Sequence, residues 1–277
     1  MAAMAAAAHA WDTARPAQVG VLATRLDMPA PALLTSDSAW LAIKSYGAID
    51  AVQGFDHLLA LASCRRRVST SCRNYDGSVP PSSYQVVGNH GDAFEVLIQA
   101  AGYDDSDRDF VSDVDRTIWR TRELGYRRVV WVTLRENVSY LDATGRGYAA
   151  AYQRNNEALR VLHNSGQYPE LIIADWANYA RDRPEWFSAD GIHMNRRGAY
   201  ASADYISRKM AFLDRRACPN PPAPGQAVQN PCPDPDATGP VNDIEGLYPT
   251  TEFGPHSGLA LVWEGRGSWP NPPWWAP

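Results

Sequence analysis

Short apolar runs alternate with longer amphipathic stretches from about residue 32 to residue 213. Each run is apolar almost throughout, as expected for strands that are buried on both faces of a parallel sheet. The runs cover residues 32–35, 56–63, 95–102, 128–134 and 171–176. The pattern therefore predicts five parallel strands.

The stretches between these runs have helical spacing. Residues 109–124 and 148–165 are each followed by a glycine suited to a helix C-terminus, and a last helix is predicted over residues 197–213. The first of these helices is expected to face the sheet with Phe110, Val114, Ile118 and Trp119. Alternation of strands and helices predicts an α/β fold, a three-layer sandwich with right-handed crossovers.

Composition divides the chain into three regions. An Ala-rich lead-in covers residues 1–31, the predicted α/β domain covers residues 32–215, and an irregular Pro- and Trp-rich appendage covers residues 216–277. The four tryptophans of the appendage either stack on sugar rings or fasten the appendage across the sheet edge. We favour fastening, because stacking platforms usually sit on rigid elements. These tryptophans are Trp263, Trp269, Trp274 and Trp275.

Length and charge exclude several classes of protein. The 277 residues are 45% hydrophobic, too apolar for a disordered chain, and the apolar runs are too short to span a bilayer. The net charge is −5, and the basic residues are scattered apart from short clusters such as residues 65–67, so no nucleic-acid partner is expected. That cluster either contacts an anionic wall polymer or forms a solvated turn or a local ion pair, and we favour the second interpretation.

The four cysteines form two local pairs, Cys64 with Cys72 and Cys218 with Cys232. Neither pair has the spacing of a zinc site or a redox motif, so two disulfides in an oxidising compartment are predicted, with four reduced thiols as the alternative. The first ten residues are Ala-rich and end in Ala-His-Ala, like the end of a secretory signal. We therefore expect a protein that is secreted or held in the cell envelope. We also expect it to be a monomer.

Candidate catalytic groups follow the first and the fifth predicted strand. Ser38 lies where a strand turns into a helix, and Asp190 and His193 lie three residues apart across a glycine. The carboxyl ends of parallel strands are where active groups gather in α/β sheets. A carboxylate on one imidazole nitrogen leaves the other nitrogen free to face a serine hydroxyl, which is the arrangement that nucleophilic catalysis needs.

Three motifs in this order resemble blocks I, III and V of the SGNH/GDSL hydrolases. They are residues 36–38 (SDS), 102–105 (GYDD) and 190–195 (DGIHMN). Residues 130–194 are especially similar to the extracellular SGNH domains of proteins that O-acetylate peptidoglycan and to their free-standing actinobacterial relatives. The resemblance implies that Ser38 is the nucleophile, His193 the general base and Asp190 the residue that orients His193.

The resemblance also implies an oxyanion hole, and here the sequence departs from the family. Ser38 is expected to contribute, and the second donor is expected to be the backbone N–H of Arg65 or of the neighbouring Arg66. Gly88 and Gly91 are less favoured, because they lie in a polar stretch before the third strand. The family's asparagine is Asp104, whose ionised carboxylate would repel an oxyanion. Three outcomes are open: Asp104 is protonated, it turns away and Asp105 or backbone takes its place, or activity is low or lost.

The leading hypothesis is an exported serine esterase that hydrolyses small acyl esters, of which acetyl is favoured, on a small molecule, a carbohydrate or a cell-wall polymer. The mechanism needs no metal or organic cofactor. Two alternatives stay open. One is an O-acyltransferase that uses the same residues, and the other is a catalytically weak carbohydrate-binding module of the cell wall.

Overall fold

The structure is a computed structural model that describes residues 30–105, 108–139, 141, 147–241, 244–248 and 260–262. The predicted export signal and the four tryptophans of the appendage lie outside these residues. Within the described ranges, no helix is both long enough and apolar enough to cross a lipid bilayer.

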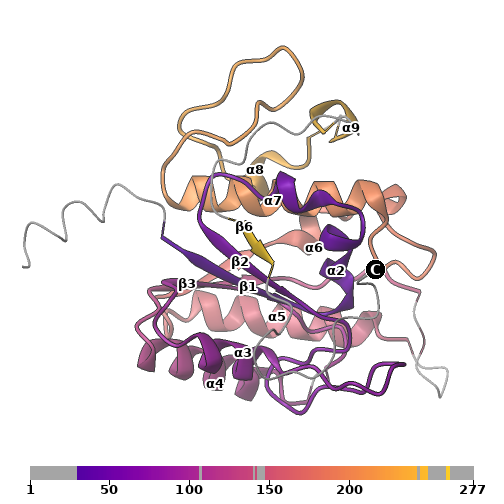
Figure 1. The fold of residues 1–277 in the computed structure, drawn as a ribbon, viewed down its shortest axis with the longest axis vertical. Helices are drawn as coiled ribbons and strands as arrows, with labels where there is room; N and C mark the ends of the chain where they lie inside the picture. The colour runs from indigo at the N-terminus through magenta and orange to yellow at the C-terminus, as the bar shows by residue number, and fades with distance from the viewer. Residues whose placement is uncertain are drawn as a thin grey trace, which may run out of the picture.

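A parallel sheet forms the centre of the molecule (Figure 1). Its strands in the described ranges are β1 (Ala32–Ser36), β2 (His57–Leu61), β3 (Val96–Ala100), β4 (Arg128–Val132), β5 (Leu171–Ala174) and β6 (Ala260–Val262). They run in the order β5-β4-β3-β1-β2-β6, and every neighbouring pair is parallel. The five predicted strands and the α/β class are confirmed. The short strand β6 from the appendage extends the sheet, because it pairs with β2.

Helices cover both faces of this sheet, which gives the three predicted layers (Figure 1). One face carries α2 (Ser38–Ser45), the 3-10 helix η1 (Ala48–Ala51), α6 (Trp176–Tyr179) and α7 (Arg196–Leu213), and the other carries α3 (Ser83–His90), α4 (Phe110–Glu123) and α5 (Ala149–Asn164). The remaining helical segments are the 3-10 helix η2 (Pro184–Trp186), α8 (Pro235–Thr238) and α9 (Ile244–Leu247). Helix α3 was not predicted, although Ser82 and Gln85 form a capping box at its start.

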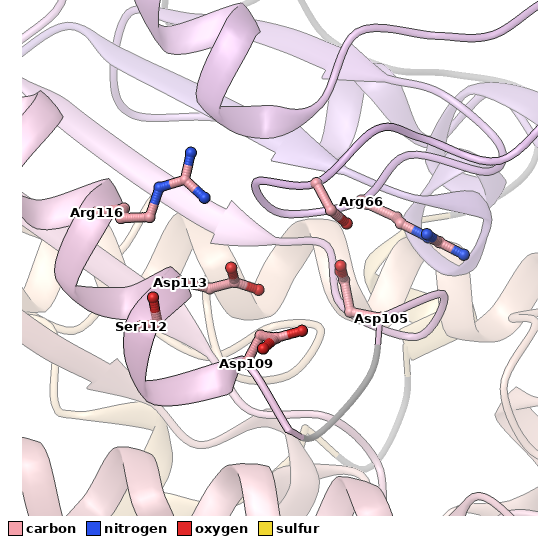
Figure 2. A pocket seen from close by; sticks show the side chains of 7 residues that line it. Arg66, Asp105, Asp109, Ser112, Asp113 and Arg116 are labelled. Atoms are coloured by element: carbon pink, nitrogen blue, oxygen red, sulfur yellow. The ribbon is translucent and has the colours of Figure 1, made fainter.

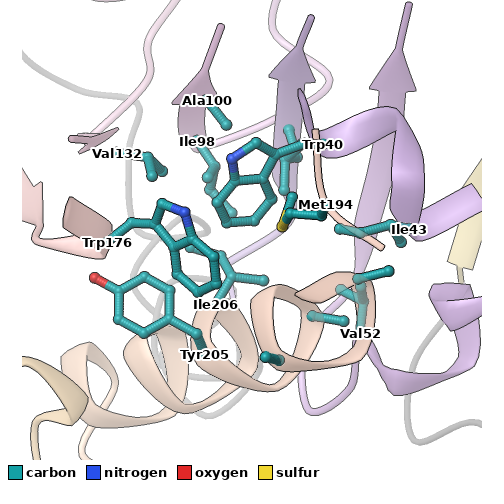
Figure 3. Close-up of a cluster of buried hydrophobic side chains, with 14 of the residues drawn as sticks. Trp40, Ile43, Val52, Ile98, Ala100, Val132, Trp176, Met194, Tyr205 and Ile206 are labelled. Atoms are coloured by element: carbon teal, nitrogen blue, oxygen red, sulfur yellow. The ribbon is translucent and has the colours of Figure 1, made fainter. Parts of the chain in front are cut away.

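The core on the α2 and α7 face is rich in aromatic rings (Figure 3). Trp40 packs against Trp176 with ring centroids 5.5 Å apart, and Trp176 also packs against Tyr205 of α7. Trp186 stacks on Trp176 at 6.0 Å and is 3% exposed, so it belongs to the core rather than to an open substrate surface. The expected sheet-facing position of Trp119 is wrong, because its side chain is 58% exposed.

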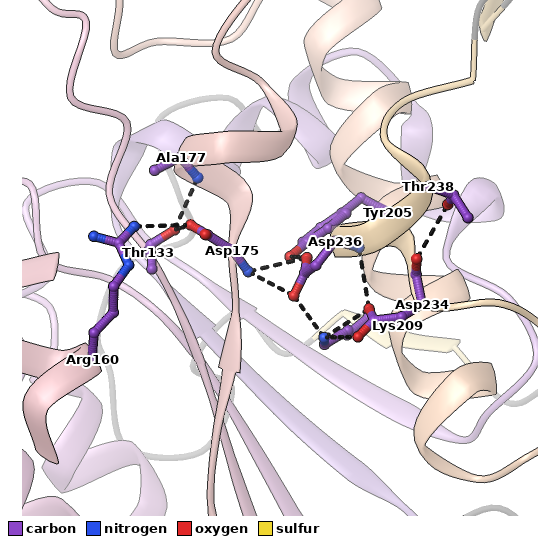
Figure 4. Close-up of polar contacts among 9 residues, drawn as sticks. All are labelled: Thr133, Arg160, Asp175, Ala177, Tyr205, Lys209, Asp234, Asp236 and Thr238. Carbon is purple, nitrogen blue, oxygen red and sulfur yellow. Dashed lines mark hydrogen bonds and ion pairs between the residues drawn. The ribbon is translucent and has the colours of Figure 1, made fainter. Parts of the chain in front are cut away.

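Both predicted cysteine pairs are joined as disulfides, Cys64 to Cys72 and Cys218 to Cys232. The second disulfide lies in the segment after α7, and polar contacts fasten this segment to the core (Figure 4). Lys209 of α7 donates to Asp234 at 2.9 Å and to Asp236 at 2.7 Å.

Candidate active site

The site lies at the carboxyl edge of the sheet, where the strand order changes direction. β1 is flanked by β2 on one side and by β3 on the other, so the loops that follow β1 and β3 leave the sheet on opposite faces. Ligand sites of open α/β sheets form at such a switch point. The loop after β1 leads into α2, which begins at Ser38, and the loop after β3 carries Asp104.

Ser38 is the first residue of α2 and is half-buried. The preceding Asp37 caps the helix, because its carboxylate accepts the backbone N–H of Ala39 at 3.0 Å. The first backbone N–H groups of a helix have no partner inside the helix and carry a partial positive charge. The serine therefore lies at a point where the backbone favours negative charge.

His193 lies between Ser38 and Asp190. Its Nε2 is 3.0 Å from Ser38 Oγ, and its Nδ1 is 2.6 Å from Asp190 Oδ2. The imidazole is 45% exposed and the Asp190 side chain 26% exposed, so the group opens to solvent. The structure thus brings together the three residues to which the sequence assigned catalytic roles, within hydrogen-bond distance and in the order serine, histidine, carboxylate.

A tight turn holds Asp190 in place. Its Oδ1 accepts the backbone N–H groups of Ile192 at 2.9 Å and of His193 at 3.0 Å. Burial raises the pKa of Asp190, but the hydrogen bonds from His193 and from these backbone groups outweigh burial and lower the pKa below its usual value. Gly191 has φ +74°, and a Cβ there would lie 2.7 Å from the carbonyl oxygen of Asn137. The turn therefore requires glycine.

Asp37 also joins the loop after β1 to the loop after β3. Its Oδ2 accepts the backbone N–H groups of Gly102 at 2.7 Å and of Tyr103 at 2.8 Å. Burial raises the pKa of Asp37 to about 7, and the neighbouring Asp104 raises it as well, although the three backbone donors oppose the change. The sequence marked Asp37 as part of a motif and gave no sign of this bridging role.

Asp104 occupies the position where the motif that the sequence resembles has asparagine. Burial raises its pKa, against the lowering effects of Arg66 and His193. Its Oδ2 is buried and accepts or donates no hydrogen bond among the described residues. The carboxyl group therefore lies close to His193, and one of its oxygens has no partner within the described part of the chain.

The arginines of residues 65–67 are held by contacts within the protein, so the prediction of a solvated turn is wrong for the buried Arg65 and Arg67. Arg65 is buried, and its guanidinium donates to Pro81 O at 2.9 Å and to Ala60 O. Arg67 is also buried, and its Nε lies 3.1 Å from Asp113. The guanidinium of Arg66 donates to Asp104 O at 3.0 Å. The role of the Arg65 backbone N–H in an oxyanion hole stays a prediction.

Arg135, which the sequence analysis did not single out, supports the turn that carries Asp190. The residue follows β4, is 2% exposed, and donates from Nη1 to Gly191 O at 2.9 Å and to Asn137 O. Its guanidinium lies 4.2 Å from the ring centre of Phe187, and its backbone N–H donates to Tyr103 Oη at 2.7 Å. In the sequence, the signal for this supporting role is a charged residue at the end of a predicted buried strand.

A polar cavity of about 310 Å³ borders the loop after β3. Figure 2 shows the carboxyl groups of Asp105, Asp109 and Asp113 between α4 and the loop that carries Arg66. Asp105 and Asp113 already contact Arg67. Across the described ranges, no cluster of three or more His, Cys, Asp and Glu residues is arranged to hold a metal ion.

Comparison with known proteins gives distant likenesses only. No family model and no curated protein matches the chain. Among solved structures, a gut microbial diltiazem-metabolizing enzyme is 10% identical over 67% of this chain and 47% of its own, with a TM-score of 0.45. A salicylyl-acyltransferase from a tetracycline biosynthetic pathway is 17% identical over 68% and 55%, with a TM-score of 0.44. A carbohydrate acetylesterase family member from Sinorhizobium meliloti is 12% identical over 65% and 98%, with a TM-score of 0.46.

The chain therefore spans about half the length of the first two of these proteins. At this level of similarity, the likenesses carry no functional inference, and the function proposed below rests on the geometry of the site.

Proposed function

We propose that this protein is a serine esterase that forms an acyl-enzyme on Ser38. The observation that carries the proposal is the continuous pair of contacts, 3.0 Å from Ser38 Oγ to His193 Nε2 and 2.6 Å from His193 Nδ1 to Asp190 Oδ2. A hydroxyl within hydrogen-bond distance of a base, with the base itself oriented by a carboxylate, is the constellation of nucleophilic acyl transfer.

The reaction proceeds in two half-reactions. His193 takes the hydroxyl proton as Ser38 Oγ attacks the acyl carbon, and it then protonates the departing alcohol. Asp190 keeps the imidazole in the tautomer whose Nε2 accepts that proton, and it stabilises the imidazolium. In the second half-reaction, His193 activates water, which releases the acid and regenerates Ser38.

Negative charge on the attacked carbonyl oxygen is stabilised by backbone N–H groups. The N-terminus of α2 supplies the Ser38 N–H and the positive end of the helix. A protonated Asp104 would add an O–H donor, whereas an ionised Asp104 would oppose the charge. The raised pKa of Asp104 favours the protonated form more than in a free aspartate.

The substrate class we propose is a small acyl ester, with acetyl favoured, on a carbohydrate or cell-wall polymer outside the cytoplasm. The two disulfides support an oxidising compartment. The resemblance of residues 130–194 to domains that act in O-acetylation supports the acyl group. A sugar hydroxyl in place of water in the second half-reaction would make the same site an O-acyltransferase.

Covalent labelling tests the proposed function. A fluorophosphonate should label the wild-type protein on Ser38, and His193→Ala should abolish labelling because the base is lost. Ser45→Ala is the matched control, since Ser45 is an exposed serine at the end of the same helix α2 and its replacement should leave labelling unchanged.

Circular dichroism would show that each variant is folded. A folded wild-type protein that is not labelled would contradict the esterase and favour a carbohydrate-binding module. Product analysis with and without an added sugar acceptor separates hydrolysis from transfer, because only a transferase moves the acyl group to the sugar.

A further inference from the structure

A second cavity, of about 670 Å³, opens at the carboxyl ends of β4 and β5. Its lining comes from the loop after β4, from α5, and from the segment at and after α6. Its charged lining residues are Arg135, Glu136, Arg160, Asp175 and Arg181, and Asn178 adds a neutral amide. Figure 4 shows part of this region, with Arg160 beside Asp175.

The carboxylates of this cavity are already occupied. Arg160 lies 3.3 Å from Asp175 and 3.9 Å from Glu136, and Asn156 Nδ2 donates to Glu136 at 2.9 Å. Arg160 therefore offsets one of the two negative charges, and with Arg135 and Arg181 included the lining carries three positive and two negative charges. The remaining cations of the lining are Arg135 and Arg181.

Neither of these two arginines forms an ion pair with a carboxylate in the part of the chain that the structure describes. Arg135 is 2% exposed, its printed hydrogen bonds go to backbone carbonyls, and its Nε is buried without a partner among the described residues. A buried charge without a counter-ion is costly, and this cost falls when an anion binds beside it.

We propose that this cavity binds an anionic group, a carboxylate or a phosphate, carried by the molecule whose ester is attacked at Ser38. The proposal rests on the proposed esterase function and specifies its substrate. Planar guanidinium groups bind carboxylate and phosphate oxygens with paired N–H donors, and the side-chain amide of Asn178 adds a neutral donor.

The cavity borders the turn of the candidate catalytic residues. Arg135 lines the cavity and donates to Gly191 O at 2.9 Å, and Gly191 follows Asp190 directly. A ligand in the cavity is therefore separated from the turn by a single side chain. The anionic group of the substrate would bind in this cavity and determine which substrates are accepted, while the acyl ester of the same molecule lies at Ser38.

Direct binding tests the proposal without requiring turnover. The Ser38→Ala variant of the full chain is titrated calorimetrically at low salt with trigalacturonate, with uncharged galactotriose and with galactose 6-phosphate. We expect at least one anionic sugar to bind about tenfold more tightly than galactotriose, a difference of about 1.4 kcal/mol. The ratio of the dissociation constants of trigalacturonate and galactose 6-phosphate shows whether the cavity prefers a carboxylate or a phosphate.

Arg181→Gln in the same Ser38→Ala background should remove most of this preference, because it deletes an exposed cation of the lining. Arg183→Gln is the matched control, because Arg183 lies two residues away, pairs with Glu185 at 3.7 Å and does not line the cavity. Equal binding of charged and uncharged sugars, or equal effects of the two variants, would overturn the proposal. Failure of the esterase itself would appear separately, as loss of fluorophosphonate labelling in the wild-type protein.

Discussion

The carboxyl groups of Asp37 and Asp104 interact within the site, and burial raises the pKa of both. Asp37 uses its oxygens on three backbone N–H groups, so it serves as an anchor for the loops after β1 and β3. Asp104 has no such partners for Oδ2 in the described part of the chain. The protonation of Asp104 therefore determines whether the site gains a donor or a negative charge.

We expect Asp104→Asn to increase hydrolysis of a nitrophenyl acetate ester by about 10²-fold at pH 8, since one oxyanion donor is typically worth that much. The increase should be smaller at pH 5. A raised pKa means that Asp104 keeps its proton to higher pH than a free aspartate, and the donor is lost as pH rises through that value. The measurement is kcat/KM from pH 5 to pH 9.

The ratio of the variant rate to the wild-type rate at each pH is the informative quantity, because pH effects that both proteins share cancel in it. Asp109→Asn is the control, since Asp109 is an exposed carboxylate before α4. An unchanged rate for Asp104→Asn across this pH range would show that Asp104 does not limit ester hydrolysis.

Some residues of the candidate site could be predicted from the sequence, and others could not. Ser38, Asp190 and His193 were predictable because their types and order form a motif at predicted strand ends. The bridging role of Asp37 and the support from Arg135 depend on contacts with residues about 65 and 56 positions away, which no local pattern reveals.

At the scale of elements, the start of α7 is packed closely against the 3-10 helix η2. A Cβ at Gly198 would lie 2.2 Å from the carbonyl oxygen of Trp186 and 3.0 Å from the Cβ of Met194. This contact involves backbone, which cannot move as a side chain can. The residue also follows the loop that carries Asp190 and His193, so the fit of α7 fixes the end of that loop.

We expect Gly198→Ala to lower the free energy of unfolding by about 1–3 kcal/mol, as overpacking does. Gly88→Ala is the matched control, because Gly88 is also helical and its Cβ would meet only the end of the Arg120 side chain, at 3.0 Å. Alanine there should stabilise α3 by up to about 1 kcal/mol. Urea unfolding of both variants measures the difference, and equal midpoints would contradict this account.

Helices and strands could be predicted from the sequence where burial of hydrophobic side chains determines their positions. The strands are apolar because the sheet is covered on both faces, so their positions followed from hydrophobicity alone. Helix α4 was found by its spacing, but Trp119 was assigned to the wrong side. Adjacent residues on a helix point about 100° apart, so burial of Ile118 directs Trp119 toward solvent.

At the scale of the whole molecule, the segment after α7 is fastened to the core by one buried lysine. The Lys209 side chain is 4% exposed and contacts Asp234 and Asp236. Asp236 also accepts the hydroxyl of Tyr205 at 2.7 Å and the backbone N–H of Asp175 at 3.2 Å. Helix α8 is thereby tied to α7 and to the end of β5 (Figure 4).

We expect Lys209→Met to lower the free energy of unfolding by about 3 kcal/mol, because it leaves two partly buried carboxylates without their cation. Lys44→Met is the control, as Lys44 is the only other lysine of the chain and lies on α2. Thermal unfolding under non-reducing conditions keeps the Cys218–Cys232 disulfide intact. Similar melting temperatures for the two variants would argue against the anchoring role of Lys209.

Strand β6 has a consequence for how copies of this protein behave toward one another. It pairs with residues 57–59 of β2, the strand that would otherwise end the sheet. An exposed edge strand has unpaired backbone N–H and C=O groups, which can pair with a strand of another chain and thereby promote aggregation. Because β6 pairs with residues 57–59 of β2, it covers this part of the sheet edge. A chain cleaved before residue 260 would lack β6 and would expose the edge of β2 to other copies of the protein.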